Sequence, residues 1–223
     1  MGVVWITGAS RGIGFATTEK FLSNGWQVVV LTRAIDKLEP LIKEYPGQLH
    51  ICKLDLMQLD EVQFPNLPVD ILINNAGALI NKPFSQVSIT DLHKSYGVNV
   101  FGPYLLIQKL LTQFTEKAHI VNISSVGGIQ GSVKFAGLSA YSSAKGAMNV
   151  LTECLHAEFE QETQWSFNAL ALGAVQTEML KEAFPGLQAP MQPEQLSPFI
   201  YMFATTAHLV MRGKVLPVSM STP

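Results

Sequence analysis

Cysteine is scarce in this sequence, and its scarcity excludes several kinds of protein. The chain of 223 residues contains two cysteines, Cys52 and Cys154, which lie far apart. They form no close-spaced pair, so neither a disulfide framework nor a zinc knuckle is indicated. The five histidines are scattered without a His-Glu-x-x-His arrangement, and we predict no metal site. We therefore expect a protein of a reducing compartment, the cytoplasm.

Clustered charge and long apolar runs are lacking as well. The formal net charge is -2 and no basic block occurs, so nucleic acid and anionic membranes are not expected as partners. No uninterrupted apolar run reaches the roughly 20 residues of a transmembrane helix, so no membrane association is expected. Hydrophobic residues make up 48% of the chain, which is enough for a buried sheet and excludes a disordered chain. A small ligand remains open.

Short apolar runs rich in β-branched residues alternate with longer helical patterns. Continuous apolar strands of this kind are typical of a parallel sheet that helices cover on both faces. The fold class is therefore predicted as α/β, a doubly wound, mostly parallel seven-stranded sheet, in a single domain over residues 1–223. The crossover 56–68 contains two prolines and is too short for a long helix. The predicted strands are 3–7, 27–33, 49–55, 69–75, 119–125, 167–172 and 214–218.

The predicted helix 90–114 is apolar nearly all round, whereas a surface helix would show one apolar stripe. It needs a partner besides the sheet, and an identical subunit is the simplest candidate. We expect a homodimer or homotetramer through the helices 90–114 and 139–162.

A glycine-rich turn, Thr7 to Gly14, follows the first strand directly and leads into a helix. Gly8, Gly12 and Gly14 remove side chains where a diphosphate approaches backbone N–H groups and the positive end of the helix dipole. The Lys-Ser/Thr ending of a triphosphate loop is missing, which favours a dinucleotide. The alternative is a tight structural turn. The expected contacts from this turn are Gly8, Ser10, Arg11, Gly12, Ile13 and Gly14.

The end of the second strand bears on the choice between NAD and NADP. An NAD-binding protein usually carries an acid here for the ribose 2'-hydroxyl, but this chain has Thr32 and Arg33. Arg33, with Arg11, can instead pair with a 2'-phosphate. We expect NADP(H), with NAD(H) as the alternative. Asp55, followed by Leu56, closes the third strand and is suited to accept from the adenine amino group; its alternative role is a helix N-cap.

Tyr141 and Lys145 are four residues apart, so on a helix they share one face. An ammonium group there favours the phenolate, and together with a cationic oxidised nicotinamide it is expected to lower the tyrosine pKa from about 10 to about 7 or 8. The pair therefore indicates a proton donor for catalysis. The alternative is an ordinary solvated helix face.

Taken together, these motifs resemble the short-chain dehydrogenase/reductase family, of the compact single-domain, Rossmann-like type. The resemblance runs nearly end to end, through Thr7-Gly8-x-x-x-Gly12-x-Gly14, Asp55, Asn74-Asn75-Ala76-Gly77, Asn99, Ile123-Ser124-Ser125, Tyr141-x-x-x-Lys145, and Gly173 to Thr177. The sequence departs from the family at Leu172, where proline is common, and in a longer loop between Ser125 and Tyr141.

The resemblance implies a role for each matching residue. Tyr141 is the expected general acid or base, Ser125 binds the substrate carbonyl, and Lys145 binds the nicotinamide ribose. Asn99 holds the water of a proton relay through a local backbone irregularity; the alternative is a buried asparagine satisfied by a neighbour. The remaining cofactor contacts implied are Asn75, Ala76, Gly77, Gly173, Val175 and Thr177.

The predicted function is hydride transfer between NADP(H) and a small carbonyl or alcohol substrate. The rival hypotheses are a non-catalytic dinucleotide-binding regulator and an NAD-preferring dehydrogenase. The loop 126–140 and the stretch 178–192 contain mainly apolar residues and no arginine, so an uncharged, moderately apolar substrate is expected.

Overall fold

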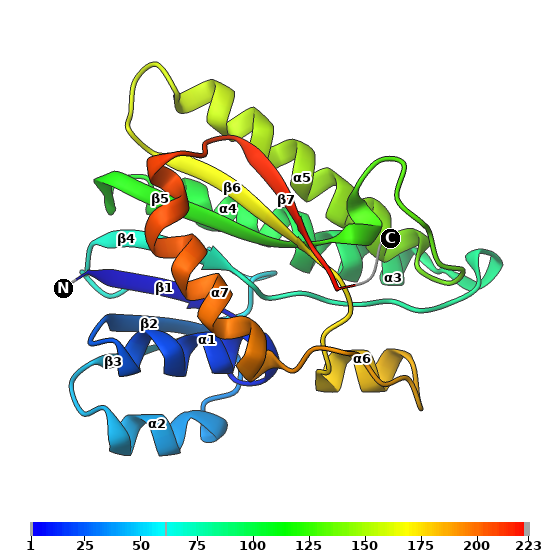
Figure 1. Cartoon of the computed structure of the whole chain (residues 1–223), viewed down its shortest axis with the longest axis horizontal. Coiled ribbons are helices and arrows are strands. Elements are labelled where there is room, and N and C mark those ends of the chain that lie inside the picture. Colours follow the sequence, from blue (N-terminus) through cyan, green and yellow to red (C-terminus); the bar gives the residue numbers. More distant parts are fainter. Residues whose placement is uncertain (1, 61, 221–223) are drawn as a thin grey trace.

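A computed structural model describes residues 2–60 and 62–220 of the chain, which form one seven-stranded sheet with helices on both faces (Figure 1). All strand pairs are parallel, in the order β3-β2-β1-β4-β5-β6-β7, so the predicted doubly wound α/β fold is confirmed. The strands are β1 (Val3–Thr7), β2 (Gln27–Thr32), β3 (Leu49–Lys53), β4 (Val69–Asn74), β5 (Phe114–Ser125), β6 (Ser166–Leu172) and β7 (Lys214–Val218). The α-helices are α1 (Gly12–Ser23), α2 (Glu39–Glu44), α3 (Ile89–Tyr96), α4 (Gly102–Leu110), α5 (Ser139–Phe159), α6 (Glu178–Ala183) and α7 (Pro193–Thr206).

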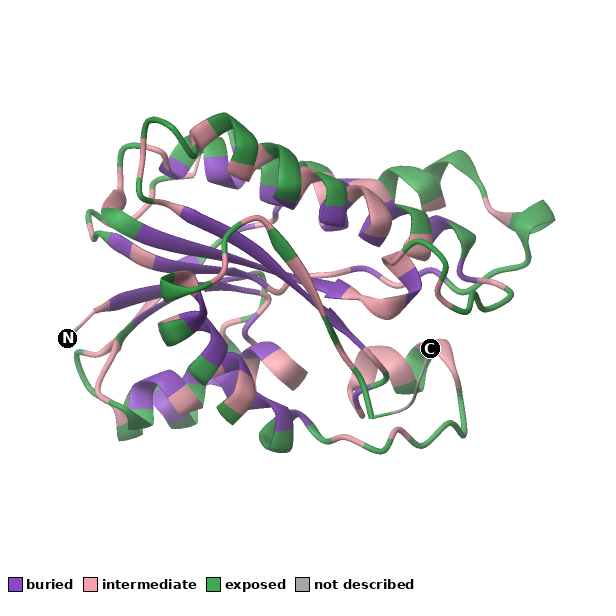
Figure 2. Ribbon diagram, turned by 45° about the horizontal axis from the view of Figure 1, so that its top comes forward, coloured by how far each residue is buried: buried purple, intermediate pink, exposed green. Residues whose placement is uncertain are grey.

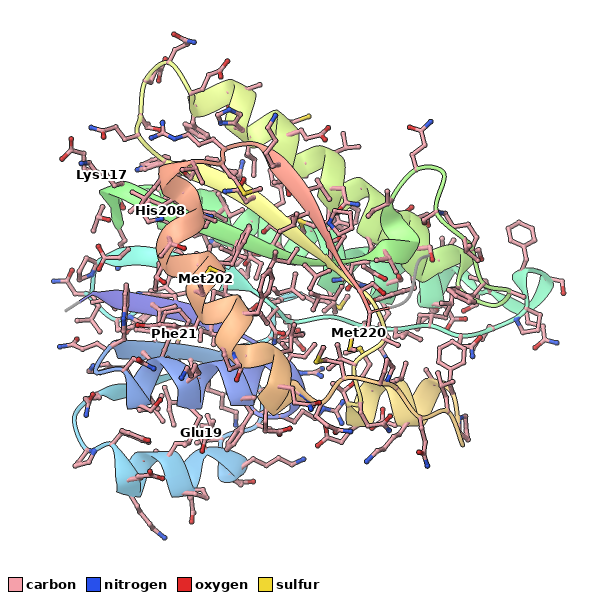
Figure 3. The ribbon with its side chains drawn as sticks, viewed as in Figure 1. Glu19, Phe21, Lys117, Met202, His208 and Met220 are labelled. Atoms are coloured by element: carbon pink, nitrogen blue, oxygen red, sulfur yellow. The ribbon has the colours of Figure 1, made fainter. Side chains whose placement is uncertain are left out.

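The buried strands carry apolar side chains on both faces because helices cover both. Helices α1, α2 and α7 pack on one face, and α4 and α5 on the other (Figure 1). Figure 2 shows the strands as a buried layer between two helical layers with exposed outer surfaces. Phe21 of α1 points toward α7, where its ring centroid lies 4.9 Å from that of Tyr201 (Figure 3).

The two helices predicted with bounds, 90–114 and 139–162, end earlier in the structure. The predicted helix 90–114 is broken by a π-helical turn, Gly97–Phe101, between α3 and α4, and it ends at Leu110. Phe114 instead begins β5, since it pairs with Val69 across a register shift and packs on Trp165 with ring centroids 5.1 Å apart. The helix predicted as 139–162 ends at Phe159.

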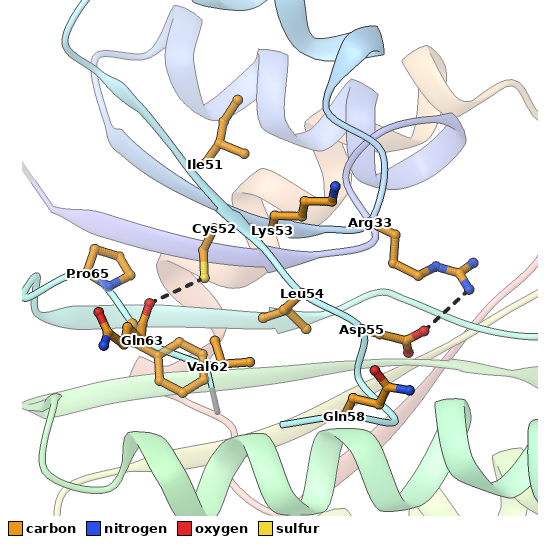
Figure 4. Close-up of a pocket in the computed structure, with 11 residues that line it drawn as sticks. Arg33, Ile51, Cys52, Lys53, Leu54, Asp55, Gln58, Val62, Gln63 and Pro65 are labelled. Carbon is orange, nitrogen blue, oxygen red and sulfur yellow. Dashed lines mark hydrogen bonds and ion pairs between the residues drawn. The ribbon is translucent and has the colours of Figure 1, made fainter. Parts of the chain in front are cut away.

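The crossover between β3 and β4 has no helix in its described parts, 54–60 and 62–68, as the two prolines predicted. Val62, Phe64 and Leu67 cover the sheet there in place of a helix. A groove of about 860 Å³ runs along β3 beside this segment (Figure 4). It is lined by Arg33, Ile51, Cys52, Lys53, Leu54, Asp55, Gln58, Val62, Gln63, Phe64 and Pro65.

A buried histidine fastens α7 to the sheet. His119 of β5 is 1% exposed, with Nδ1 2.8 Å from the carbonyl oxygen of Ala204 and Nε2 3.0 Å from Nδ2 of Asn168. Burial lowers the pKa of His119 to about 4, so the ring is neutral at pH 7.

Candidate active site

The parallel sheet places the carboxyl ends of all its strands along one edge, and the predicted site residues follow those ends. Thr7, Asn74 and Ser125 end β1, β4 and β5, while Gly173 follows β6. Residues separated by more than a hundred positions are thereby brought to one edge.

The glycine turn after β1 is fastened to the end of β4. Thr7 Oγ1 accepts hydrogen bonds from the backbone N–H of Asn75 (3.0 Å) and of Ala76 (2.9 Å). In return, the side-chain Nδ2 of Asn75 donates to the carbonyl oxygens of Thr7 (2.9 Å) and Gly8 (3.2 Å). Gly8 has a φ of 67°, and a Cβ there would lie 2.7 Å from Cα of Ala76. Glycine is therefore required at position 8 by both the conformation and the close approach.

The start of α1 fits a diphosphate. Arg11 occupies the N-cap and its side chain makes no capping hydrogen bond, so the first N–H groups of the helix are left for an anion. Ser10 lies in the turn, and Ile13, in the first turn of α1, packs against the apolar core.

Arg33, which is expected to favour NADP over NAD, lies with Asp55 at one end of the groove along β3 (Figure 4). Arg33 is exposed and its Nη1 is 3.8 Å from Oδ2 of Asp55. Thr32 Oγ1 accepts a hydrogen bond from the N–H of Ala34 at 3.3 Å, just beyond the end of β2. Leu56 is buried. Asp55 Oδ1 accepts from the N–H of Met57 at 3.0 Å. Asp55 thus caps a turn; no helix follows it in the described part of the crossover.

Ser125, Tyr141 and Lys145 meet at the centre of the edge. The Tyr141 hydroxyl is hydrogen-bonded to Ser125, and the Lys145 ammonium lies 5.8 Å from the centre of the Tyr141 ring. Lys145 is 4% exposed, and its Nζ donates to the carbonyl oxygen of Ile123 at 2.8 Å. An ammonium group has three N–H donors, so two remain for other acceptors such as ribose hydroxyls.

The protein alone does not have the lowered Tyr141 pKa that is expected when Lys145 acts together with an oxidised nicotinamide. Burial raises the pKa of Tyr141 to about 12, although the hydrogen bond from Ser125 opposes this shift. Burial also lowers the pKa of Lys145 to about 8, because no carboxylate pairs with it among the contacts described. Desolvation therefore determines the direction of the Tyr141 pKa shift in the protein alone.

Asn99 lies in the π-helical turn, which is the backbone irregularity expected around it. Its side chain is 1% exposed and fully engaged. Nδ2 donates to the carbonyl oxygens of Ala78 and Ser95, each at 2.8 Å, and Oδ1 accepts from the N–H of Ala78 at 3.3 Å. A Cβ on Gly77 would lie 3.1 Å from that Oδ1. These contacts match the alternative considered from the sequence, a buried asparagine satisfied by neighbours.

The chain after β6 returns to the glycine turn. The N–H of Gly173 donates to the carbonyl oxygen of Val218 at 2.8 Å, and Val175 forms a parallel bridge with Met191. Thr177 caps α6, with Oγ1 accepting from the N–H of Leu180 at 3.2 Å. A Cβ on Gly12 would lie 3.2 Å from Cγ2 of Thr177, so the start of α6 lies against the turn.

Two positioning contacts were not predicted from the sequence. Ser124 Oγ donates to the carbonyl oxygen of Lys145 at 3.2 Å, which ties β5 to α5 beside the site. A Cβ on Gly128 would lie 2.7 Å from the backbone carbon of Lys145, so glycine permits the close approach of these two segments. The one sequence signal for the Ser124 contact was a second serine next to Ser125. Neighbouring strand residues face opposite sides of a sheet, so Ser124 was expected to point away from Ser125.

Comparisons with known proteins agree with this geometry. The family model described as short chain dehydrogenase matches residues 2–188. Carbonyl reductase (NADPH) 2 of Sus scrofa is 33% identical over 156 residues, 69% of this chain and 64% of the reductase. The 3-oxoacyl-(acyl-carrier-protein) reductase of Aquifex aeolicus (strain VF5) is 32% identical over 187 residues, 78% of this chain and 74% of that protein.

Solved structures share the fold. A 4-hydroxyisoleucine dehydrogenase mutant complexed with NADH and succinate superposes with a TM-score of 0.85 at 24% identity, covering 97% of this chain and 96% of that chain. A serine dehydrogenase complexed with NADP+ gives 0.83 at 24% identity, covering 97% and 94%.

The match with some relatives is partial. It covers 64% of the length of the porcine reductase, and 56% of an uncharacterized oxidoreductase of Mycobacterium tuberculosis (strain ATCC 25618 / H37Rv) that is 32% identical over 80% of this chain. In the described part of the chain, no helix combines the length and apolar character needed to span a bilayer.

The family model matches residues 2–188, and relatives such as the Aquifex reductase match most of this chain. These matches establish that this chain belongs to the short-chain dehydrogenase/reductase family of oxidoreductases.

Proposed function

We propose that this chain is an NADP(H)-dependent oxidoreductase that interconverts a small carbonyl compound and its alcohol, with Tyr141 as general acid and base. The observation that carries the proposal is the hydrogen-bonded pair of Ser125 and Tyr141, with the buried ammonium of Lys145 beside it. A bound nicotinamide supplies or accepts the hydride. In the protein, Ser125 and Tyr141 offer two O–H donors to one carbonyl oxygen, which stabilises negative charge as it develops there.

The pair of Tyr141 and Lys145 argues against the rival hypothesis of a non-catalytic regulator, because a chain that only bound a dinucleotide would not need a proton donor beside Ser125. Tyr141 is protonated near pH 7, which is the form that donates a proton during carbonyl reduction. The replacement of Tyr141 by Phe removes one hydroxyl. We expect it to lower turnover by about 10² to 10⁴ while cofactor affinity stays nearly unchanged.

This activity is tested with a spectrophotometric screen of aldehydes, ketones and sugars with NADPH and NADH. A Tyr141→Phe variant that kept more than about a tenth of wild-type turnover would show that another group donates the proton. A matched control is Tyr45→Phe, because Tyr45 follows α2 and belongs neither to the site nor to a proposed subunit interface.

The preference for NADP(H) is supported by Arg33 and by the lack of an acid at Thr32. Arg33 is exposed and weakly held by Asp55 at 3.8 Å, so it is free to turn toward a 2'-phosphate. One charge-assisted hydrogen bond is worth about 1.5 to 3 kcal/mol, and we expect NADPH to bind about 10- to 100-fold more tightly than NADH. Calorimetry on the wild type and on Arg33→Ala tests this. Equal dissociation constants for the two cofactors in the wild type would favour the alternative, an NAD(H) dehydrogenase.

The substrate proposed is uncharged and moderately apolar. The segment with Asn81 and Lys82 contacts both the end of α6 and the loop 126–140. Asn81 Nδ2 donates to the carbonyl oxygen of Ala183 at 2.8 Å, and the N–H of Lys82 donates to the carbonyl oxygen of Gly137 at 3.0 Å. The loop containing Gly137 exposes the apolar side chains Val133 and Phe135. A ketone with a carboxylate preferred tenfold or more over its uncharged analogue, in kcat/KM, would overturn this substrate class.

A homodimer or homotetramer is supported by exposed apolar side chains on α3, α4 and the turn between them. Leu92, Phe101, Tyr104 and Leu105 are each more than a third exposed, which leaves an apolar surface for a second copy. Light scattering at micromolar concentration tests this proposal, and a monomer mass would refute it. The free cysteines Cys52 and Cys154 support a reducing, cytoplasmic compartment.

A further inference from the structure

Helix α6 is held against the rest of the site at both of its ends. At its start, Thr177 lies against Gly12 of the glycine turn. Toward its end, Oε1 of Glu182 accepts a hydrogen bond from Nη1 of Arg11 at 3.0 Å, and the carbonyl oxygen of Ala183 accepts from Asn81. The contact between Arg11 and Glu182 joins residues 171 positions apart, so it links the cofactor turn directly to α6.

The proposed function gives Arg11 a second partner. Arg11 precedes Gly12 in the turn and was expected, with Arg33, to neutralise a cofactor 2'-phosphate. In the structure its guanidinium is instead directed to Glu182. A phosphate of charge near -2 attracts a guanidinium more strongly than one carboxylate does, but it also repels that carboxylate when the two share the same cation.

The pair of Arg11 and Glu182 is also open to exchange. The two side chains are 41% and 67% exposed, and an exposed ion pair of this kind contributes little to stability. Arg11 can therefore leave Glu182 at small cost. When Arg11 leaves, α6 loses its contact at Glu182. It keeps the hydrogen bond between Asn81 and the carbonyl oxygen of Ala183, because that bond involves no charged side chain.

We propose that Glu182 competes with the cofactor 2'-phosphate for Arg11 and so reduces the preference of the protein for the phosphorylated cofactor. Glu182 is then a positioning residue that determines cofactor specificity through Arg11, without touching the cofactor. This inference rests on the proposed binding of a nicotinamide dinucleotide at the glycine turn. It predicts that removing the charge of Glu182 strengthens binding of a 2'-phosphate selectively.

The test uses two fragments of the cofactor, adenosine 2',5'-bisphosphate and adenosine 5'-monophosphate, titrated calorimetrically into the full chain. Glu182→Gln keeps the size of the side chain and removes its charge. We expect about two- to fivefold tighter binding of the bisphosphate and unchanged binding of the monophosphate. The gain should shrink at about 0.5 M salt, because the charges are exposed. A variant with a disturbed α6 would change both affinities by the same factor.

Glu178→Gln is the matched control, because Glu178 lies one turn earlier on α6 and forms no ion pair with Arg11 among the described contacts. It should change the two affinities by the same factor. The second control is Arg11→Met, in which the Glu182→Gln substitution should no longer alter the ratio of the two affinities. An unchanged ratio in Glu182→Gln, a weaker bisphosphate affinity, or the same effect without Arg11 would each overturn the inference.

The failure of this inference is distinguishable from the failure of the proposed function. A wild-type protein that binds the bisphosphate more tightly than the monophosphate, but whose ratio Glu182→Gln leaves unchanged, refutes the role of Glu182 alone. A wild-type protein that binds neither fragment, and neither NADPH nor NADH, refutes the dinucleotide site and with it this inference.

Discussion

The replacement of Lys145 by methionine should make the protein more stable and inactive. Lys145 is 4% exposed, and its burial lowers its pKa from the ordinary 10.5 to about 8. At about 1.4 kcal/mol for each pKa unit, this difference means that the buried charge destabilises the fold by about 3 kcal/mol at pH 7. Methionine has a similar length and carries no charge. It loses the hydrogen bond to the carbonyl oxygen of Ile123, which offsets about 1 kcal/mol.

The net gain in the free energy of unfolding is therefore about 2 kcal/mol at pH 7. It depends on pH in a defined direction. The destabilisation by Lys145 is complete below pH 8, where the lysine is charged in both states. It is lost as the pH rises from about 8 to 10.5, because the native lysine then loses its proton before the unfolded one. Near pH 9.5 the variant and the wild type should have almost equal stability.

Urea unfolding followed by tryptophan fluorescence, at one protein concentration, measures this difference. Lys37→Met is the control, because Lys37 is exposed, and it should stay within about 0.5 kcal/mol of the wild type at both pH values. Destabilisation of Lys145→Met at pH 7, or a gain that does not change with pH, would refute the reasoning. Either result would mean that the ammonium is better solvated or paired than the structure indicates.

Three further outcomes are expected. Alcohol oxidation should accelerate as the pH rises from 7 to 9 while carbonyl reduction does not, because the raised pKa of Tyr141 keeps its base form scarce; pH profiles of kcat in both directions check this. Gly128→Ala should lower kcat by more than about tenfold, because its Cβ would press on the backbone of Lys145, whereas Gly146→Ala, whose nearest contact is 3.2 Å, should be milder. The unfolding free energy should fall as the pH drops from 6.5 to 4, because His119 stays neutral in the folded chain and takes up a proton when the chain unfolds. Urea titrations of His119→Gln should show a fall that is about 3 kcal/mol smaller.

The fold was predictable from the sequence because its strands are apolar on both faces. Continuous apolar runs such as Val3 to Thr7 are typical of a parallel sheet covered on both faces, and the structure places them there. The break in the predicted helix 90–114 was not predictable from periodicity. The π-helical turn depends on where Asn99 finds partners in Ala78 and Ser95, and these contacts form only in the folded chain.

The candidate site was predictable in its residue types and less so in its electrostatics. The spacing of Tyr141 and Lys145 placed the two side chains on one helix face, as the structure has them. In the protein alone the Tyr141 pKa is raised, since desolvation depends on the packing of the whole edge, whereas the predicted lowering also involves an oxidised nicotinamide. The partner of Arg11 was likewise hidden, because Glu182 is 171 positions away and on an exposed surface.

The strand order has a consequence for how the chain folds. The central strand of the sheet, β4, pairs with β1, where Val4 lies opposite Ile71, so the middle of the sheet forms between segments far apart in the sequence. Contacts between residues so far apart in the sequence cost chain entropy before they stabilise the fold. Folding is therefore slow. Until β4 is in place, β1 and β2 present an unpaired edge that other chains can join. We therefore expect the yield of refolding to fall as protein concentration rises.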